Sequence, residues 1–305
     1  QYPACHPILA SLPKLTIHSW LTALQTERLE QKAQLIMQRL ELCNSNWEDA
    51  FFITLARNFG FGLNGDAFET WAGLLPFRAM DKHRNDLFQI EAFFYGLAGL
   101  LEETFLKKEQ EDEYSLRLCK EFRYLQRKFE IGQGIDVTLW RFLRLRPENF
   151  PHIRLAQLAY LYQKGDKLFS RLLEADTLTD VRALLDTRTS SYWENHYLFG
   201  RLSPQKEKTM GERSKDLIII NTVVPFLYTY GLHKADERMC ERAARFLEEL
   251  KAESNHIIRS WSDAGLPVVT AADSQALIQL QKEYCDKRKC LYCRFGYEYL
   301  KHTNI

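Results

Sequence analysis

The chain has 305 residues, 27% of them charged and 46% hydrophobic, and its 41 Lys and Arg against 40 Asp and Glu leave a formal net charge of +1. A chain of this length can bury a large core, and its balanced charge gives no global electrostatic case for binding nucleic acid or a membrane surface. The longest apolar run, residues 217–232, is interrupted by Asn221 and Pro225 and falls short of the roughly 20 residues that cross a bilayer. We expect no membrane-spanning helix.

The first residues and the cysteines indicate the setting of the protein. The chain opens on Gln1, lacks the charged start and apolar stretch of a secretory signal, and, without an initial Met, is expected to be a fragment of a longer protein. Seven cysteines are an odd number, and four of them are scattered: Cys5, Cys43, Cys119 and Cys240. A reduced, cytoplasmic setting is therefore expected.

Apolar residues recur at helical spacing along nearly the whole chain. After an extended arm over residues 1–15, the pattern predicts one long helix over 17–42 and a second that begins at Asn46, with Glu48 and Asp49 in its first turn. Further helices are expected, in chain order, over 64–75, 86–103, 110–129, 136–145, 151–163, 178–185, 216–230, 235–251, 255–262 and 274–284, with a loop over 204–212.

These elements predict an all-α protein, an irregular array of about 12 to 14 helices joined by short loops. Residues 16–305 are expected to form a single large helical unit. Gly132 and Gly134 mark the most plausible internal joint, at residues 132–135, although so short a segment is also typical of an ordinary turn.

The most specific local pattern is the Cys-x4-Cys-x2-Cys spacing of Cys285, Cys290 and Cys293. Three thiols on one loop can converge on a metal, but a structural zinc site takes four Cys or His ligands and an iron–sulfur cluster usually takes four thiolates. Zinc is the favoured cofactor and an iron–sulfur cluster the second choice. The candidates for the missing ligand are His302, Cys5, His6, Cys240 and His256.

Two alternatives to a metal site stay open for the cysteine loop. Its basic neighbours would lower the thiol pKa and favour thiolates, which suits redox reactivity as well as metal binding. Reduced thiols that merely pack a helix corner explain the same spacing.

Two basic segments are candidates for nucleic-acid or anion binding. The cysteine loop combines tyrosines with Lys287, Arg288, Lys289 and Arg294, a mixture that suits single-stranded nucleic acid. The segment 140–154 gathers a second set at a helix end and a helix start, where a phosphate could be held: Arg141, Arg144, Arg146 and Arg154. Solvated charges and structural ion pairs are the preferred explanation of both sets.

No catalytic motif is present, and no catalytic residue is predicted. Nucleophile-elbow, phosphate-loop and metalloprotease patterns are missing, and the 8 histidines form no His-x3-His pair. Glu91 shares a helical face with Leu87, Phe94 and Ala98, which could bury its carboxylate and raise its pKa. A structural, paired glutamate is the preferred interpretation.

Four motifs carry a family resemblance: WEDAFF at 47–52, LARNFG at 55–60 with Asn64, RLRPENFPHIR at 144–154 and DSQALI at 273–278. On these residues the whole chain resembles the C-terminal, helical part of an uncharacterised bacterial family with a domain of unknown function, family 2851. The resemblance implies that full-length members begin with a nuclease-like segment, whose Gly-Pro-Asp-Phe and Val-Glu-Ile-His motifs do not occur here. The cysteine loop is also similar to the iron–sulfur loop of endonuclease-three-type DNA glycosylases, with a shorter first spacing and no fourth cysteine.

The leading hypothesis is a non-catalytic helical region that contacts nucleic acid beside a nuclease-like N-terminal segment of the same parent protein. The alternative is a helical protein-interaction scaffold whose cysteine-rich loop is a structural, zinc-type element. An enzyme in its own right ranks third.

Overall fold

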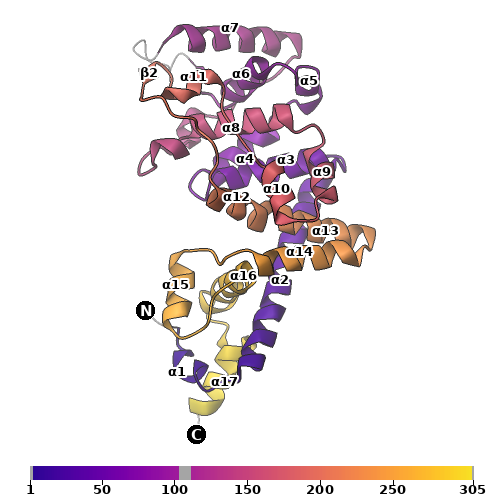
Figure 1. Cartoon of the computed structure of the whole chain (residues 1–305), viewed down its shortest axis with the longest axis vertical. Helices are drawn as coiled ribbons and strands as arrows, with labels where there is room; N and C mark the ends of the chain where they lie inside the picture. Colours follow the sequence, from indigo (N-terminus) through magenta and orange to yellow (C-terminus); the bar gives the residue numbers. More distant parts are fainter. Residues whose placement is uncertain (1–2, 103–110, 304–305) are drawn as a thin grey trace. The chain divides into compact units, whose positions relative to one another are not determined.

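The computed structural model describes residues 3–102 and 111–303 (Figure 1). Most of the described residues are helical, so the prediction of an all-α fold is confirmed. Residue contacts divide the chain into two compact units, residues 43–222 and residues 1–42 with 223–305. We call the first the central unit, because it is central in the sequence, and the second the terminal unit. The predicted joint at 132–135 lies inside the central unit.

The central unit is a series of short helices with one small hairpin. Its hairpin pairs two antiparallel strands, which the sequence did not predict. Its elements are α3 (Trp47–Phe59), α4 (Gly65–Gly73), α5 (Phe77–Asp81), α6 (Leu87–Leu97), α7 (Glu113–Lys128), η2 (Val137–Leu139), η3 (Pro147–Asn149), α8 (Pro151–Lys164), α9 (Leu168–Glu174), α10 (Leu178–Leu184), α11 (Ser191–Glu194), β1 (His196–Leu198), β2 (Arg201–Leu202) and α12 (Glu212–Ile218), followed by the π-helical turn η4 (Ile219–Val223), whose last residue belongs to the terminal unit.

The terminal unit joins the first helices of the chain to the last ones. Its longest helix, α2, contacts both α13 and α16, which lie far from it in sequence. Its elements are α1 (His6–Leu9), α2 (Lys14–Leu42), α13 (Val224–Lys234), α14 (Glu237–Glu249), α15 (His256–Asp263), α16 (Ala271–Gln279), the π-helical turn η5 (Leu280–Cys285), η6 (Cys290–Tyr292) and α17 (Arg294–Thr303).

Capping residues explain where several helices begin. The side chain of Asn46 accepts hydrogen bonds from the backbone N–H groups of Glu48 and Asp49, which confirms the predicted start of α3. Asp112 and Thr270 each form a capping box, at α7 and α16. Such side chains satisfy N–H groups that have no partner inside the helix, so local sequence fixes these boundaries.

The predicted helix over 136–145 is wrong. Only the 3-10 turn Val137–Leu139 forms, and tertiary hydrogen bonds take over after it. The indole N–H of Trp140 donates to the carbonyl of Ala98 at 2.8 Å, and the Asn64 side chain accepts from the N–H of Arg141 and donates to its carbonyl, at 2.8 and 2.9 Å. These partners satisfy the backbone without a helix.

The segment at the predicted joint is packed against the end of α6. The N–H of Ile135 donates to the carbonyl of Leu97 at 2.9 Å, and a Cβ atom at Gly134 would lie 2.5 Å from the same oxygen. Glycine is required here because the two backbones approach so closely. The predicted extended arm also contains a helical turn, α1, and α2 begins at Lys14.

Aromatic side chains fill the core of the central unit. The Trp71 and Phe94 rings meet edge to face with centroids 4.7 Å apart, and the Tyr95 and Trp193 centroids are 5.3 Å apart. The four rings are at most 1% exposed. Ring pairs of this kind add to the large apolar area that each aromatic residue buries.

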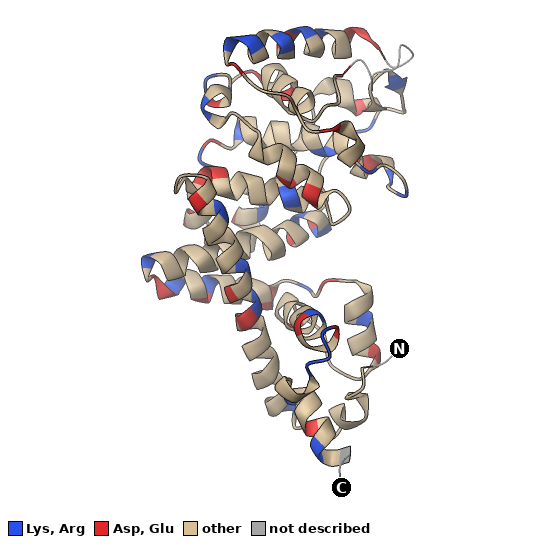
Figure 2. Cartoon of the chain, turned by 180° about the vertical axis from the view of Figure 1, so that it is seen from behind, with Lys and Arg blue, Asp and Glu red and all other residues tan. Residues whose placement is uncertain are grey.

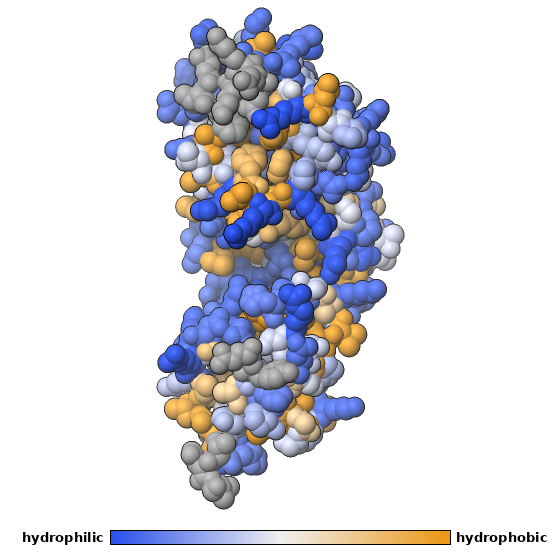
Figure 3. Space-filling view, turned by 90° about the vertical axis from the view of Figure 1, so that its left-hand side faces the viewer, coloured by the Kyte–Doolittle hydropathy of each residue, from blue (hydrophilic) through white to orange (hydrophobic). Residues whose placement is uncertain are grey.

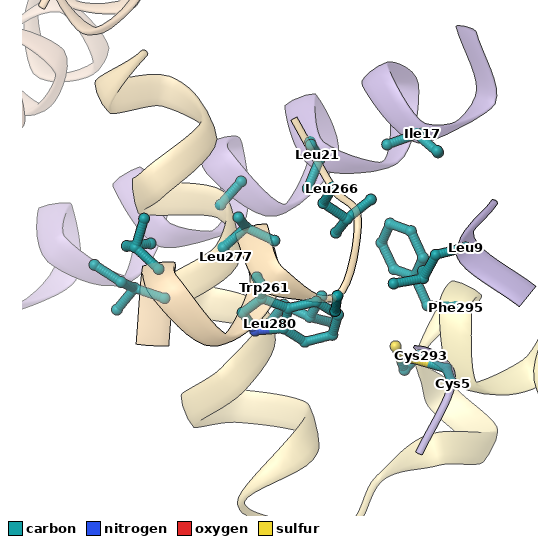
Figure 4. Packing of buried hydrophobic residues seen from close by; sticks show 14 of the residues in the cluster. Cys5, Leu9, Ile17, Leu21, Trp261, Leu266, Leu277, Leu280, Cys293 and Phe295 are labelled. Carbon is teal, nitrogen blue, oxygen red and sulfur yellow. The ribbon is translucent and has the colours of Figure 1, made fainter. Parts of the chain in front are cut away.

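The core of the terminal unit gathers side chains from both ends of the sequence (Figure 4). Leu9, Ile17 and Leu21 come from its first helices, and Leu277 and Phe295 come from its last ones. Figure 4 shows Cys5 and Cys293 next to one another at one end of this cluster. The hydrophobic core therefore brings a cysteine from the start of the chain to the C-terminal cysteine loop.

No helix among the described residues combines the length and the apolar character that a membrane span needs. Hydrophilic residues predominate on the face drawn in Figure 3, with smaller apolar groups between them.

Candidate metal centre

The three C-terminal cysteines lie on a loop that local hydrogen bonds fold back on itself. After α16, the π-helical turn η5 ends at Cys285, whose carbonyl accepts from the N–H of Arg288 at 3.0 Å. The N–H of Lys289 donates to the carbonyl of Tyr284 at 2.8 Å, and the N–H of Cys293 donates to the carbonyl of Cys290 at 3.2 Å. A π-helical turn is uncommon and often marks a functional site. Here it ends at the first cysteine of the loop.

Gly296 lets the first turn of α17 lie against this loop. A Cβ atom at this position would be 2.6 Å from the carbonyl oxygen of Cys290, so a larger residue would push Cys290 away. The Gly296 N–H also donates to Sγ of Cys293 at 3.5 Å. An N–H group directed at a sulfur stabilises its thiolate form.

Cys5 is the fourth cysteine at this place. It precedes α1, is 6% exposed, and belongs to the same buried cluster as Cys293, which is 7% exposed. Contacts between α1 and α17 hold it there. The sequence offered Cys5 as one of five candidates for a fourth ligand.

A cavity of about 650 Å³ is lined by all four of these cysteines. Its other polar lining includes His256, Gln281 and Arg288. Among the described residues that line it, none of the remaining candidate ligands His6, Cys240 and His302 is found. Hence the structure brings together Cys5, Cys285, Cys290 and Cys293, with His256 near them.

Burial governs the ionisation of these thiols. It raises the pKa of Cys5 and of Cys285 to about 12, and the neighbouring thiols add to the shift in both cases. Burial likewise raises the pKa of Cys293, against the opposing effect of the Gly296 N–H. The expectation that basic neighbours lower the thiol pKa is therefore wrong for Cys285 and Cys293, because the charged groups of Lys287, Arg288, Lys289 and Arg294 stay exposed to water.

The four thiols line one cavity but are not grouped as the ligands of one ion. Within residues 3–102 and 111–303, no group of three or more His, Cys, Asp or Glu is placed so that it could hold a metal ion. A centre at this site would therefore have to be larger than one ion, or the thiols would have to move to bind it.

The predicted anion-binding arginines do not share one environment. Arg141, Arg144 and Arg146 are exposed. Arg154 is 6% exposed, donates to the side chains of Gln157 and Asn149, and lies over the Phe61 ring at 4.4 Å. Its buried contacts brace the central unit, so only the first three point to a surface.

A basic surface that the sequence reasoning missed lies on α7 (Figure 2). Four exposed cations recur there at three- and four-residue spacing, Arg117, Lys120, Arg123 and Arg127, and the exposed Lys128 follows directly. The helical period of the positive charges along this segment is the sequence signal for such a surface.

The buried carboxylate of Glu91 lies in a polar cluster of the central unit. Glu91 is 1% exposed and accepts hydrogen bonds from the hydroxyls of Tyr114 and of Ser190, the latter at 2.9 Å. Burial raises its pKa to about 7, while these hydrogen bonds work in the opposite direction. The carboxylate is thus paired within the fold, as the preferred structural interpretation required.

Comparison with known proteins places the chain in a family. A family model matches residues 1–256, well over half of the chain. The chain belongs to the family described as Protein of unknown function (DUF2851). The resemblance inferred from the motifs is thereby confirmed. In this DUF2851 chain the match includes Cys5 and ends before Cys285, Cys290 and Cys293. No curated protein and no solved structure matches the chain.

Proposed function

We propose that the chain binds a metal centre through Cys5, Cys285, Cys290 and Cys293, and that this centre fastens the first residues of the terminal unit to its last helices. The observation that carries the proposal is that Cys5 lines the same cavity as the three cysteines near the other end of the sequence. Four cysteines complete the ligand set that the loop alone lacked.

The chemistry of the site supports a bound metal over four packed thiols. Isolated buried cysteines behave as small hydrophobes, and they fill space. These four instead line one cavity, and after burial the neighbouring thiols raise the cost of ionising both Cys5 and Cys285. A cation in the cavity would reverse that effect, because it stabilises every thiolate around it.

The metal would replace packing that α1 alone cannot supply. This helix has only 4 residues, and it holds Cys5 against α17 through a few apolar side chains. Bonds from one centre to both ends of the unit would stabilise the folded state, because the unfolded chain does not bring the four ligands together. Such a centre would be a structural element, which is the role that the alternative hypothesis of a protein-interaction scaffold gives to the cysteine loop.

The test is the metal content of the full chain purified without chelators under anaerobic conditions. We expect bound metal in the wild type, and its loss in Cys5→Ser and in Cys290→Ser. Cys240→Ser is the matched control, because Cys240 belongs to the same unit, does not line the cavity, and contacts the Tyr228 carbonyl that a serine can also reach. Wild-type protein without metal, or full retention in both cavity variants, would contradict the proposal.

A second candidate function is contact with nucleic acid, and one observation favours it. Leu291 and Tyr292 are 70% and 80% exposed, on a loop whose cations Lys287, Arg288 and Lys289 are exposed as well. Phosphates would pair with the cations and a base would stack on the tyrosine. In this role the chain would act beside a nuclease-like segment of its parent protein, as the family resemblance implies.

A salt series of binding to single- and double-stranded DNA and RNA tests this second function. Tyr292→Ala should weaken single-strand binding about 10-fold at fixed salt, since stacking contributes on the order of 1–3 kcal/mol per base. Tyr297→Ala is the control, because Tyr297 is 54% exposed and lies outside the basic loop. Binding that does not weaken as salt rises would contradict this role.

A further inference from the structure

We infer that the group held by the four cysteines is an iron–sulfur cluster and not a single zinc ion. The inference rests on the metal centre proposed above, and it names the chemistry of that centre. Three independent features of the site support it: the spacing of the ligands, the distribution of the thiols in space, and the room between them.

The spacing of the three loop cysteines suits an iron–sulfur cluster. Cys285, Cys290 and Cys293 follow a Cys-x4-Cys-x2-Cys pattern, and the fourth cysteine lies far away in sequence. Plant-type ferredoxins hold their cluster with the same two spacings between three cysteines and a separate fourth cysteine. Structural zinc sites also pair cysteines, but typically in two Cys-x2-4-Cys or His-containing halves. Here the loop supplies three cysteines, and among the described residues that line the cavity the only other cysteine is Cys5.

The thiols are not arranged for one ion. In a tetrahedral zinc site each sulfur lies about 2.3 Å from the metal, so any two sulfurs are only about 3.8 Å apart. No three ligating side chains in the described parts of the chain are placed to hold one ion. In a four-iron cluster each cysteine binds its own iron, and in a two-iron cluster two cysteines share each iron, so in both cases the four sulfurs are spread over a group larger than one ion.

The cavity that the thiols line is larger than one ion needs. Structural zinc sites are closed, because four ligands contact the metal directly. The cavity here measures about 650 Å³, many times the roughly 30 Å³ that one water molecule occupies in the liquid. A cluster of several iron and sulfide ions would fill part of it, and Cys5, Cys285, Cys290 and Cys293 would reach that cluster from its rim.

The surroundings of the sulfurs also suit such a cluster. The Gly296 N–H donates to Sγ of Cys293, and hydrogen bonds of this kind tune iron–sulfur centres. Arg288 lines the cavity beside them and can offset the negative charge of four thiolates. Ile257 and Tyr299 supply apolar and aromatic parts of the same wall.

The test is a count of iron, acid-labile sulfide and zinc in the full chain, made anaerobically after expression with added iron. We expect about two or about four irons per chain with as many sulfides, and the visible absorption of iron–sulfur bonds. Two irons would identify a two-iron cluster and four irons a four-iron cluster, and both results support the inference. Cys5→Ser should lose more than half of the iron and sulfide, whereas Cys240→Ser should keep both.

The remaining outcomes separate this inference from the proposed function. One zinc per chain without sulfide, lost in Cys5→Ser, would overturn the iron–sulfur assignment and leave the metal centre standing. Protein that takes up neither iron nor zinc, even on anaerobic incubation with ferrous iron and sulfide, would overturn both. The wild-type count does not depend on a variant, so a Cys5→Ser protein that fails to fold leaves the test intact.

Discussion

The two units of this chain both bury ionisable side chains, but they satisfy them in different ways. In the central unit, Glu91 accepts hydrogen bonds from Tyr114 and Ser190, so its own fold supplies the partners. In the terminal unit, Cys5 and Cys285 face a cavity with the other two cysteines of the site. A buried polar group paired within the fold indicates a structural role, whereas ligating groups around a cavity indicate a bound group.

Removal of the metal should produce the largest effect, and only in the terminal unit. A ligand present at 100 times its Kd stabilises the folded state by about 2.7 kcal/mol, and a centre with four thiolates should exceed that value. We expect chelation to raise amide hydrogen exchange in α1 and α17 by at least about 100-fold and to leave α6 and α8 unchanged. Equal loss of protection in both units would contradict the proposal that the metal stabilises the terminal unit alone.

Substitution of Glu91 by Gln should change the pH dependence of stability. The pKa of Glu91 is raised from 4.5 to about 7 in the folded state, so the folded protein holds more protons between these values. The free energy of unfolding of the protein therefore falls as pH rises through this interval, by at most about 3 kcal/mol. The stabilising contribution of Glu91 is fully present below pH 4.5 and is lost as pH rises through about 7. Glu91→Gln should lack this slope in denaturant titrations at pH 5 and pH 8.

An exposed carboxylate provides the control for this experiment. Glu111 lies at the surface, and Glu111→Gln should keep the wild-type slope. A Glu91→Gln protein with an unchanged slope would show that another group titrates in this interval.

Gly296→Ala should disturb the cysteine site by an intermediate amount. Its Cβ would lie 2.6 Å from the Cys290 carbonyl, which forces Cys290 and α17 apart at a cost of about 2 kcal/mol. We expect lower metal occupancy together with a lower unfolding midpoint. Gly73→Ala is the matched control, because nothing lies within 4 Å of its added Cβ, and it should retain full metal. Normal occupancy in Gly296→Ala would argue against a site built on this contact.

Tyr114→Phe should have the smallest effect, about 1 kcal/mol at pH 8, and only in the central unit. It removes a hydroxyl that donates to Glu91 while keeping the ring stacked on Tyr192, at 4.0 Å between centroids. The ionised carboxylate loses a donor, so the loss of stability should be larger at pH 8 than at pH 5. Tyr124→Phe, at a 53% exposed position on the same helix, should be neutral at both values of pH.

Local signals predicted much of the fold. Tertiary hydrogen bonds explain why the predicted helix over 136–145 does not form. Asn46 fixed the start of α3 because its cap involves only the next three residues. The segment 136–145 has a helical apolar period, yet Asn64 and Ala98 bind its backbone and Trp140 side chain in another conformation. Both partners lie far away in sequence, so no local pattern contains them.

The residues of the candidate site were likewise predicted in part by local sequence and decided in part by tertiary packing. The sequence alone identified Cys285, Cys290 and Cys293, since close spacing on one loop is a local property. It also determined the all-α class, because helical period and capping depend on neighbouring residues. Only the tertiary structure showed that Cys5 and His256, two of the five candidate ligands, line the cavity of the loop cysteines, and only it gave the direction of the thiol pKa shifts. Burial and cavities arise when distant segments pack together, and a linear pattern cannot encode which segments will meet.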